Sequence, residues 1–169
     1  MSEIKKKYWL IPLIGGLFSL IGFLIPAWYS PPIWVEYIWI IGIIHHVTGG
    51  NVLARAPLEM FIPSIITTVL ISICSFFIIL NALFKSRNKS LLIKAKNSWI
   101  ILAILEIISM IYYTIGIQFG FFQNTGLNFW DFYEIQFGLI IPFIGAGLTL
   151  IGAIIGFIVD FKSVARNIK

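Results

Sequence analysis

Four apolar segments constrain this chain more than any other feature, because each is long enough to cross a lipid bilayer as a helix. They cover residues 8–29, 61–84, 98–120 and 135–161. About 20 apolar residues span the hydrocarbon core of a membrane. Four such segments occupy most of the 169 residues, so we expect a single membrane domain, residues 1–169, of the all-α transmembrane class.

The composition agrees with a protein that is solvated by lipid. Hydrophobic residues make up 59% of the chain and charged residues 11%, whereas a soluble domain carries about 25% charged residues. This excludes a disordered tail, a coiled coil, a nucleic-acid-binding module and an ordinary cytosolic enzyme. We expect membrane lipid as a partner and no nucleic acid.

The basic residues are sorted to one side of the membrane. Of the 12 Lys and Arg residues, all except Arg55 lie before the first segment, between the second and third segments, or after the fourth. Cytoplasmic loops are enriched in Lys and Arg, so both termini and the loop 85–97 are expected to be cytoplasmic. The loops 30–60 and 121–134 are then external, and we expect a multi-pass protein of the plasma membrane.

Two apolar stretches have competing interpretations. Residues 33–47 are short for a span and contain Glu36, His45 and His46. Counting them as a span would place the basic loop outside, so we place them on the external surface. The N-terminus could also be a cleaved signal peptide, but no Ala-x-Ala-like site follows the first apolar segment.

The external loops favour strands. Residues 33–44 are rich in Ile, Val, Trp and Tyr, residues 48–51 form a turn signal, and residues 52–56 can return as a second strand before Pro57 ends it. In the second loop, residues 128–133 follow a turn signal and also predict a strand. We expect a small antiparallel sheet made by both loops; amphipathic or re-entrant segments lying on the bilayer are the alternative.

Small residues recur where helices could approach closely. Glycines repeat at intervals of seven in the fourth segment and in the first; they are Gly138, Gly145 and Gly152, and Gly15 and Gly22. Such positions are typical of helix contacts in membranes. The first and fourth segments also share the pattern Ile-Pro-x-Ile-Gly. Because the two cross in opposite directions, this suggests an inverted repeat, although similar composition alone can produce such a match.

Glu106 is the one ionisable residue well inside a span. Ser75 lies at nearly the same predicted depth on the second segment, and Ser72 matches the depth of Ser109 in the same way. These hydroxyl groups can satisfy a buried carboxyl group that holds helices together. An intramembrane carboxylate that handles ions or protons is the alternative.

No pattern of catalytic, cofactor-binding or metal-ligating residues is present. His45 and His46 are adjacent and so point to different sides, and spacing does not support Glu36 or Glu59 as further ligands. The single cysteine, Cys74, lies inside an apolar run and is interpreted as a small buried hydrophobic residue. We therefore expect no enzyme, no cofactor and no metal.

Several short motifs together resemble the claudin-like four-helix membrane proteins. They are Pro26-Ala27-Trp28 at the end of the first span and Ala54-Arg55-Ala56 before the second. Asp131-Phe132-Tyr133 and Glu134 precede the fourth span, and Gly138 lies within it. The family's Gly-Leu-Trp motif and its pair of external cysteines are missing. The resemblance covers most of the chain in order.

The resemblance implies a left-handed four-helix bundle below a small extracellular sheet. Trp28 would anchor the sheet at the bilayer, and Arg55 would bridge the sheet and the second helix by binding loop carbonyls or by pairing with Asp131 or Glu59. Without the disulfide, the sheet would depend on aromatic packing, with Trp34, Tyr37, Trp39, Trp130 and Phe132 as the candidates.

Three functions follow from these observations. The first is a non-enzymatic, claudin-like tetraspan that acts by lateral self-association or by binding other membrane proteins, with its external sheet serving adhesion, a barrier, a scaffold or an auxiliary subunit. Its candidate contact residues are Trp28, Trp34, Trp39, Arg55, Trp130, Asp131 and Tyr133. The alternative is a small transporter or channel subunit that uses Glu106. A remote alternative is a membrane enzyme acting on lipid through His45, His46 and Glu59.

Overall fold

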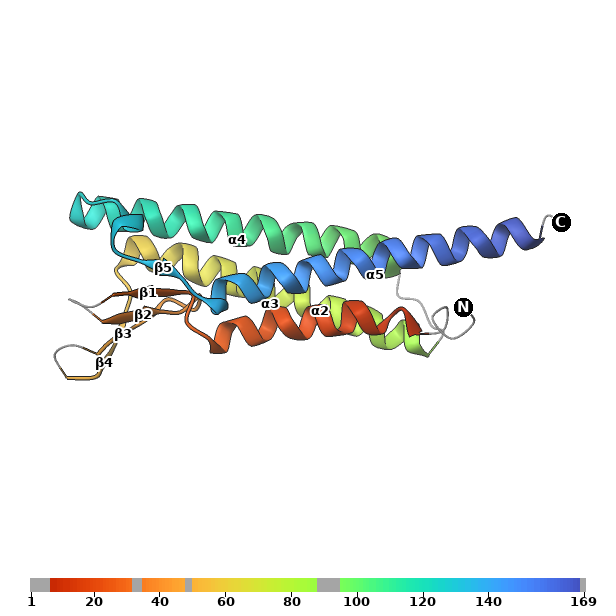
Figure 1. Cartoon of the computed structure of the whole chain (residues 1–169), viewed down its shortest axis with the longest axis horizontal. Coiled ribbons are helices and arrows are strands. Elements are labelled where there is room, and N and C mark those ends of the chain that lie inside the picture. Colours follow the sequence, from red (N-terminus) through yellow and green to blue (C-terminus); the bar gives the residue numbers. More distant parts are fainter. Residues whose placement is uncertain (1–6, 32–34, 48–49, 88–94, 168–169) are drawn as a thin grey trace.

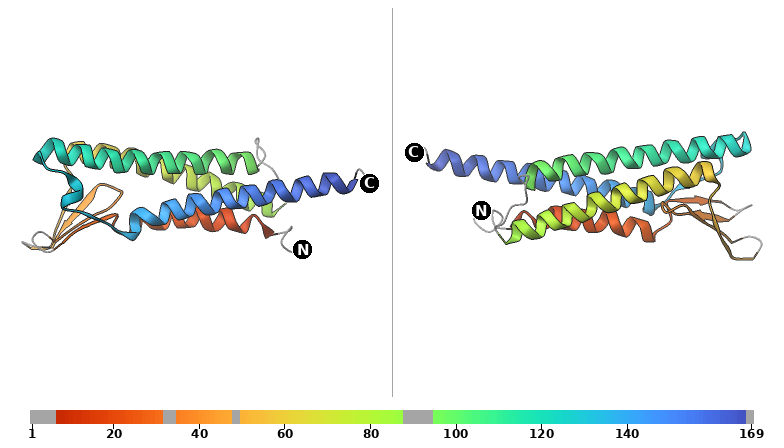
Figure 2. Two further views of the ribbon diagram at one scale, coloured as in Figure 1. Left: turned by 45° about the horizontal axis from the view of Figure 1, so that its top comes forward. Right: turned by 180° about the vertical axis from the view of Figure 1, so that it is seen from behind.

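The computed structural model describes residues 7–31, 35–47, 50–87 and 95–167, most of which are helical. The helices are α2 (Leu10–Ile21), α3 (Leu58–Ser86), α4 (Ala95–Thr125) and α5 (Phe137–Asn167), with the short 3₁₀ helices η1 (Gly22–Leu24) and η2 (Phe129–Asp131). All four α-helices run along one axis, and a small sheet lies at the end away from the start of α2 (Figure 1). Helix α2 packs on α5 and α3 packs on α4, as the further views in Figure 2 also show.

Three helices within the described residues are long and apolar enough to cross a membrane. They are Leu58–Ser86, Ala95–Thr125 and Phe137–Val159, which indicates an integral membrane protein. The first predicted span is shorter than expected. Helix α2 has 12 residues and η1 adds 3, which gives about 24 Å of helix against a hydrocarbon thickness of ~30 Å.

The prediction of a helix through residue 29 was wrong because a proline follows Ile25. Ile25 has φ −113° and ψ 139°, so it is already extended. A residue before proline is driven out of the helical region by the proline ring. The chain then enters strand β1 (Trp28–Ser30) instead of continuing as a helix.

Both predicted external loops contribute to one antiparallel sheet, so the prediction of a small antiparallel sheet is confirmed. Its strands are β1, β2 (Glu36–Ile38), β3 (Ile43–His46), β4 (Val52–Arg55) and β5 (Glu134–Ile135), in the order β4-β3-β2-β1-β5. The single strand predicted over residues 33–44 is two strands. A turn around Gly42, whose φ is +80°, reverses the chain between β2 and β3, and a glycine tolerates that conformation without a steric penalty.

The strand predicted over residues 128–133 was wrong, because that segment contains η2. Phe129 is fully buried, and its ring stacks on Tyr133 with a centroid distance of 4.5 Å and an interplanar angle of 7°. Residues four apart meet in this way on a helical turn, whereas in a strand they lie about 13 Å apart. Burying both rings therefore favours the turn.

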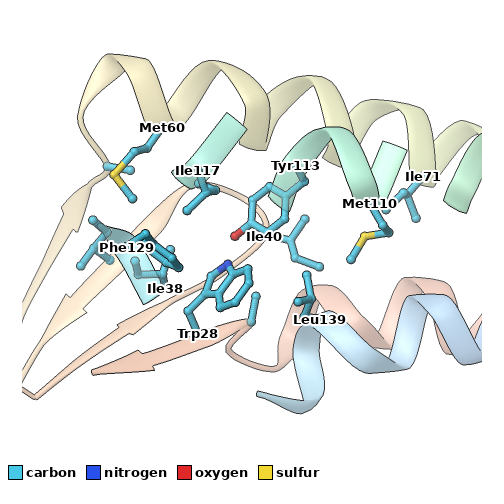
Figure 3. Packing of buried hydrophobic residues seen from close by; sticks show 13 residues of the cluster. Trp28, Ile38, Ile40, Met60, Ile71, Met110, Tyr113, Ile117, Phe129 and Leu139 are labelled. Atoms are coloured by element: carbon cyan, nitrogen blue, oxygen red, sulfur yellow. The ribbon is translucent and has the colours of Figure 1, made fainter. Parts of the chain in front are cut away.

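The inner face of the sheet and the ends of α3 and α4 enclose an apolar core. Trp28, Ile38 and Ile40 meet Met60 from α3 and Tyr113 from α4 (Figure 3). We expected Trp28 to anchor the sheet at the bilayer. Its side chain is instead completely buried inside the protein. The opposite end of the bundle has a second apolar cluster.

That second cluster contains two aromatic residues, Tyr8 and Trp99, which are 5% and 0% exposed. Their rings meet edge to face, with centroids 6.1 Å apart. Both therefore pack the helices together.

Candidate functional site

A buried carboxyl group lies between three helices. Glu106 of α4 is fully buried. Ser75 of α3 donates a hydrogen bond to Oε1 at 2.7 Å, and Ser19 of α2 donates one to Oε2 at 2.9 Å. A single side chain therefore links α2, α3 and α4.

The structure brings Glu106 and Ser75 together, but it separates the second predicted pair. The Ser109 hydroxyl donates to Leu105 O on its own helix at 2.7 Å. Its carbonyl oxygen instead accepts a hydrogen bond from Thr67 Oγ1 of α3 at 3.1 Å. Ser72 is half-buried on α3, so the depth match between Ser72 and Ser109 did not identify a contact.

Ser19 and Thr67 were missed by the sequence analysis. Ser19 is the only serine or threonine in the first apolar segment, and this could have marked it as a partner for a buried carboxyl group. Thr67 is fully buried and lies next to Thr68 on α3, and neighbouring residues of a helix differ by about 100° in direction.

The predicted glycines meet at the contact between α2 and α5. A Cβ added to Gly15 would lie 2.5 Å from the carbonyl oxygen of Gly145, which is far inside van der Waals contact. Gly138 lies in the same way against the backbone of residues 25 and 26, where the chain leaves α2. Only glycine allows the two backbones to approach this closely.

The same contact repeats in reverse order along the two helices. Pro12 of α2 packs on Gly152 of α5, and Pro142 of α5 packs on Gly22 at the end of α2. Each helix also carries a hydroxyl oxygen beside the carbonyl oxygen four residues earlier: Ser19 Oγ, whose proton bonds Glu106, lies 3.3 Å from Gly15 O, and Thr149 Oγ1 donates to Gly145 O at 3.0 Å. This is the arrangement that an inverted repeat would produce locally around Gly15 and Gly145.

A second polar site joins the two parts of the sheet. The Glu36 carboxylate lies 2.6 Å from His46 Nδ1, and it accepts a hydrogen bond from the Tyr133 hydroxyl at 2.7 Å. Burial and this hydrogen bond to Glu36 raise the pKa of Tyr133 well above its ordinary value. Because Tyr133 belongs to the second loop and the other two to the first, the contact ties the loops together without a disulfide.

Arg55 lies against the second long helix, but not through an ion pair. It is exposed, and its guanidinium carbon is 5.1 Å from the centre of the Phe61 ring of α3. The two acidic residues proposed as its partners bind elsewhere. Asp131 accepts a hydrogen bond from Asn128 at 3.4 Å, and Glu59 accepts one from Asn124 at 3.0 Å.

The remaining predicted aromatic residues differ in position. Trp130 is 40% exposed and meets Trp28 edge to face at 5.3 Å. Trp39 is half-buried on the outer face of the sheet, where its ring lies 6.3 Å from those of Tyr37 and His45. Trp34 lies outside the described residues.

The histidines and Glu59 are not brought together. His46 contacts Glu36, whereas Glu59 lies in the first turn of α3 beside Asn124. Within residues 7–31, 35–47, 50–87 and 95–167, no three His, Cys, Asp or Glu side chains are grouped so that they could hold a metal ion.

An apolar groove lies on the outside of α4 near the sheet end. Its volume is about 480 Å³, and its lining residues are Ile115, Gln118, Phe119, Phe122 and Asn128. Ile115, Phe119 and Phe122 are more than half exposed, and their spacing places them on one face of the helix. Two amides also line it: Asn128, which donates to Asp131, and the half-buried Gln118, which lies among the apolar side chains of α4.

No known protein family matches the chain, and no curated protein is detectably similar to it.

Proposed function

We propose that this chain is a non-enzymatic, multi-pass membrane protein of claudin-like type that acts by associating with a second copy of itself in the membrane. In this proposal α2 crosses the bilayer as the fourth helix of a left-handed bundle. The length of α2 supports this only in part, but its glycine contact with α5 and the Ser19 hydrogen bond to Glu106 hold it inside the helix assembly.

The proposed topology places both termini in the cytoplasm and the sheet outside the plasma membrane. It is supported by the position of the basic residues, since every Lys and Arg in the described part of the chain except Arg55 belongs to a segment at the end away from the sheet. Positive charge on loops favours retention on the cytoplasmic side.

The groove on α4 is the observation that carries the proposal of self-association. An amide that faces lipid without a partner costs free energy. Gln118 carries both a donor and an acceptor, so two copies related by a two-fold axis can satisfy each other's amides. The exposed side chains of Ile115 and Phe119 would pack around that pair.

Two substitutions in the groove test this proposal. Gln118→Leu and Ile115→Ala should each lower the dimer fraction in liposomes. Interhelical hydrogen bonds in membranes contribute about 0.6 kcal/mol and at most ~1.7 kcal/mol, so we expect association of Gln118→Leu to be weaker by about three- to eighteenfold. Ile108→Ala is the matched control, because Ile108 is 55% exposed on the same helix but lies outside the groove. Single-molecule photobleaching measures the fraction, and a monomeric native protein would contradict the proposal.

A small transporter or channel subunit that uses Glu106 is the second candidate. It is favoured by one observation, the complete burial of a carboxyl group at the meeting point of three helices. Glu106→Gln keeps the shape and can still bond both serines. Loss of proton or cation flux in liposomes with unchanged folding would support transport, and unchanged flux would leave Glu106 as a structural link.

A further inference from the structure

One edge of the sheet reaches toward the middle of the helix bundle, well past the ends of α3 and α4 that lie beside the sheet. Depth is measured here from those ends along the helices. The turn between β2 and β3 contacts two side chains from within these helices. Thr68 Oγ1 lies 3.3 Å from Ile40 O, although its proton has the shorter acceptor Ser64 O at 2.8 Å, and the Tyr113 hydroxyl donates to Trp39 O at 3.5 Å. Figure 1 shows α3 and α4 continuing alongside the sheet beyond this turn.

The depth of this turn follows from the helix rise. Glu59 and Asn124 form a polar pair at the sheet ends of α3 and α4. Thr68 lies about 14 Å below Glu59, and Tyr113 about 16 Å below Asn124, at 1.5 Å per residue. The headgroup layer of one leaflet is only about 5–8 Å thick. If the polar pair lies in the headgroups, the turn lies several ångströms deeper than the hydrocarbon boundary beside α3 and α4.

The exposed surfaces of the two helices support this depth. Exposed apolar side chains continue along both helices to the ends that lie beside the sheet. On α3 they include Ile62 and Leu58, which are 48% and 56% exposed, and on α4 they include Phe122, which is 56% exposed. On the other side of the bundle, α2 and η1 supply only about 24 Å of helix. The sheet takes the place of the missing helical turns there.

The outer face of the sheet has the composition of a membrane interface. Tyr29, Tyr37 and His45 form a cross-strand row, in which the Tyr29 and Tyr37 rings are 5.1 Å apart and the Tyr37 and His45 rings are 6.3 Å apart. Trp39, at the turn after β2, also contacts the rings of Tyr37 and His45. Rings that stand side by side in this way present their edges and polar tips outward, and such amphipathic rings are enriched where hydrocarbon meets headgroups.

Two further residues of this face point to the same environment. Leu53, opposite His45 on β4, is 69% exposed. Arg55 follows two positions later on the same face and is also exposed. An apolar side chain beside an exposed guanidinium group matches the boundary between acyl chains and phosphates.

We propose that the outer face of the sheet is a lipid-binding surface, embedded in the headgroup layer beside α2, where Arg55 binds a phospholipid phosphate. The β4 strand is an edge of the sheet, and its unpaired backbone groups require polar partners. Headgroups and water supply these partners if the bilayer is thinner beside α2 than beside α4. This proposal does not depend on self-association.

Spin-label accessibility in the full-length protein tests the proposal. A nitroxide is attached to Leu53→Cys in a Cys74→Ala background, in liposomes of phosphatidylcholine and phosphatidylglycerol. Val52→Cys is the matched control, since it is the adjacent, 53% exposed residue on the other face, and Leu24→Cys, at 78% exposure, is the lipid reference. We expect the label at position 53 to be several-fold more accessible to oxygen, relative to a water-soluble nickel complex, than the label at position 52.

Two results would overturn the proposal. A label at position 53 that is as accessible to nickel as the one at position 52 would place the face in water, and a label shielded from both reagents would indicate a protein partner. Arg55→Gln should move the label outward while Arg55→Lys should not; an unchanged depth in Arg55→Gln would exclude the phosphate contact. If Leu53→Cys does not fold, His45→Cys repeats the measurement on the neighbouring strand.

Discussion

The close contact between α2 and α5 makes a sharp prediction about two glycines that are two residues apart on the same helix. A Cβ at Gly145 would lie 2.5 Å from the carbonyl oxygen of Gly15 and 2.9 Å from the backbone nitrogen of Ser19, whereas a Cβ at Gly147 would have nothing within 4 Å. Gly145→Ala should therefore destabilise the protein and Gly147→Ala should not.

The magnitude follows from the geometry. The Ser19 hydroxyl also lies against this Cβ and could rotate away, but Gly15 O and Ser19 N belong to the backbone and cannot, so the helices must separate by about 1 Å. Overpacking of this kind costs about 1–3 kcal/mol, and any weakening of the Ser19 hydrogen bond to Glu106 adds about 0.6 kcal/mol. The better helix propensity of alanine offsets up to ~1 kcal/mol. We expect a net loss of about 1–2 kcal/mol for Gly145→Ala.

The control gains the same propensity without the clash. Gly147→Ala should be neutral or stabilising by up to ~1 kcal/mol, so the two variants should differ by about 2 kcal/mol. Reversible unfolding by sodium dodecyl sulfate in mixed micelles, followed by circular dichroism, measures both. Equal stability of the two variants would refute the close approach of α2 and α5. Gly15→Ala should resemble Gly145→Ala, and the double variant should cost less than the sum because one separation of the helices relieves both contacts.

Two more predictions concern the polar sites. Glu106→Leu should lower the free energy of unfolding by about 1–3 kcal/mol, since it removes both serine hydrogen bonds, whereas Glu106→Gln should stay within ~1 kcal/mol of the native protein in the same assay. Because the pKa of Tyr133 is raised by burial and by its hydrogen bond to Glu36, the stability it contributes is fully present below its unfolded-state pKa of about 10 and is lost as the pH rises toward the folded-state value. The thermal unfolding temperature of the native protein should therefore fall more steeply between about pH 9 and 11 than that of Tyr133→Phe. Parallel pH profiles of the two proteins would contradict this assignment.

Local patterns predicted the long helices and the β4 strand correctly, but they assigned β1 to the first helix and β2 and β3 to one strand. The apolar runs placed the ends of α3, α4 and α5 within six residues, and the turn signal before Val52 placed the return of β4. These features depend on residues close in sequence, where the period of apolar residues and the position of Gly or Pro decide the structure. The end of the first helix depends on Pro26 in the same way, but the apolar residues on both sides of it hid the boundary.

The candidate site was predicted only in part, since depth along a helix does not define its rotation. Glu106 and Ser75 lie at one level and face each other, whereas Ser72 and Ser109 lie at one level and do not. Rotation is determined by how whole helices pack, which here follows from the glycine contact and from the aromatic core around Trp28.

The sequence by itself determined that this is a membrane protein, which segments are apolar enough to cross the bilayer, and where glycine allows close contact, because these properties belong to short stretches of chain. Only the tertiary structure decided that Trp28 is buried, that Ser19 completes the Glu106 site, and that Glu36, His46 and Tyr133 join the two loops. Each of these contacts connects residues that are separated along the chain, and such contacts form only when packing fixes the rotation and depth of every element at once.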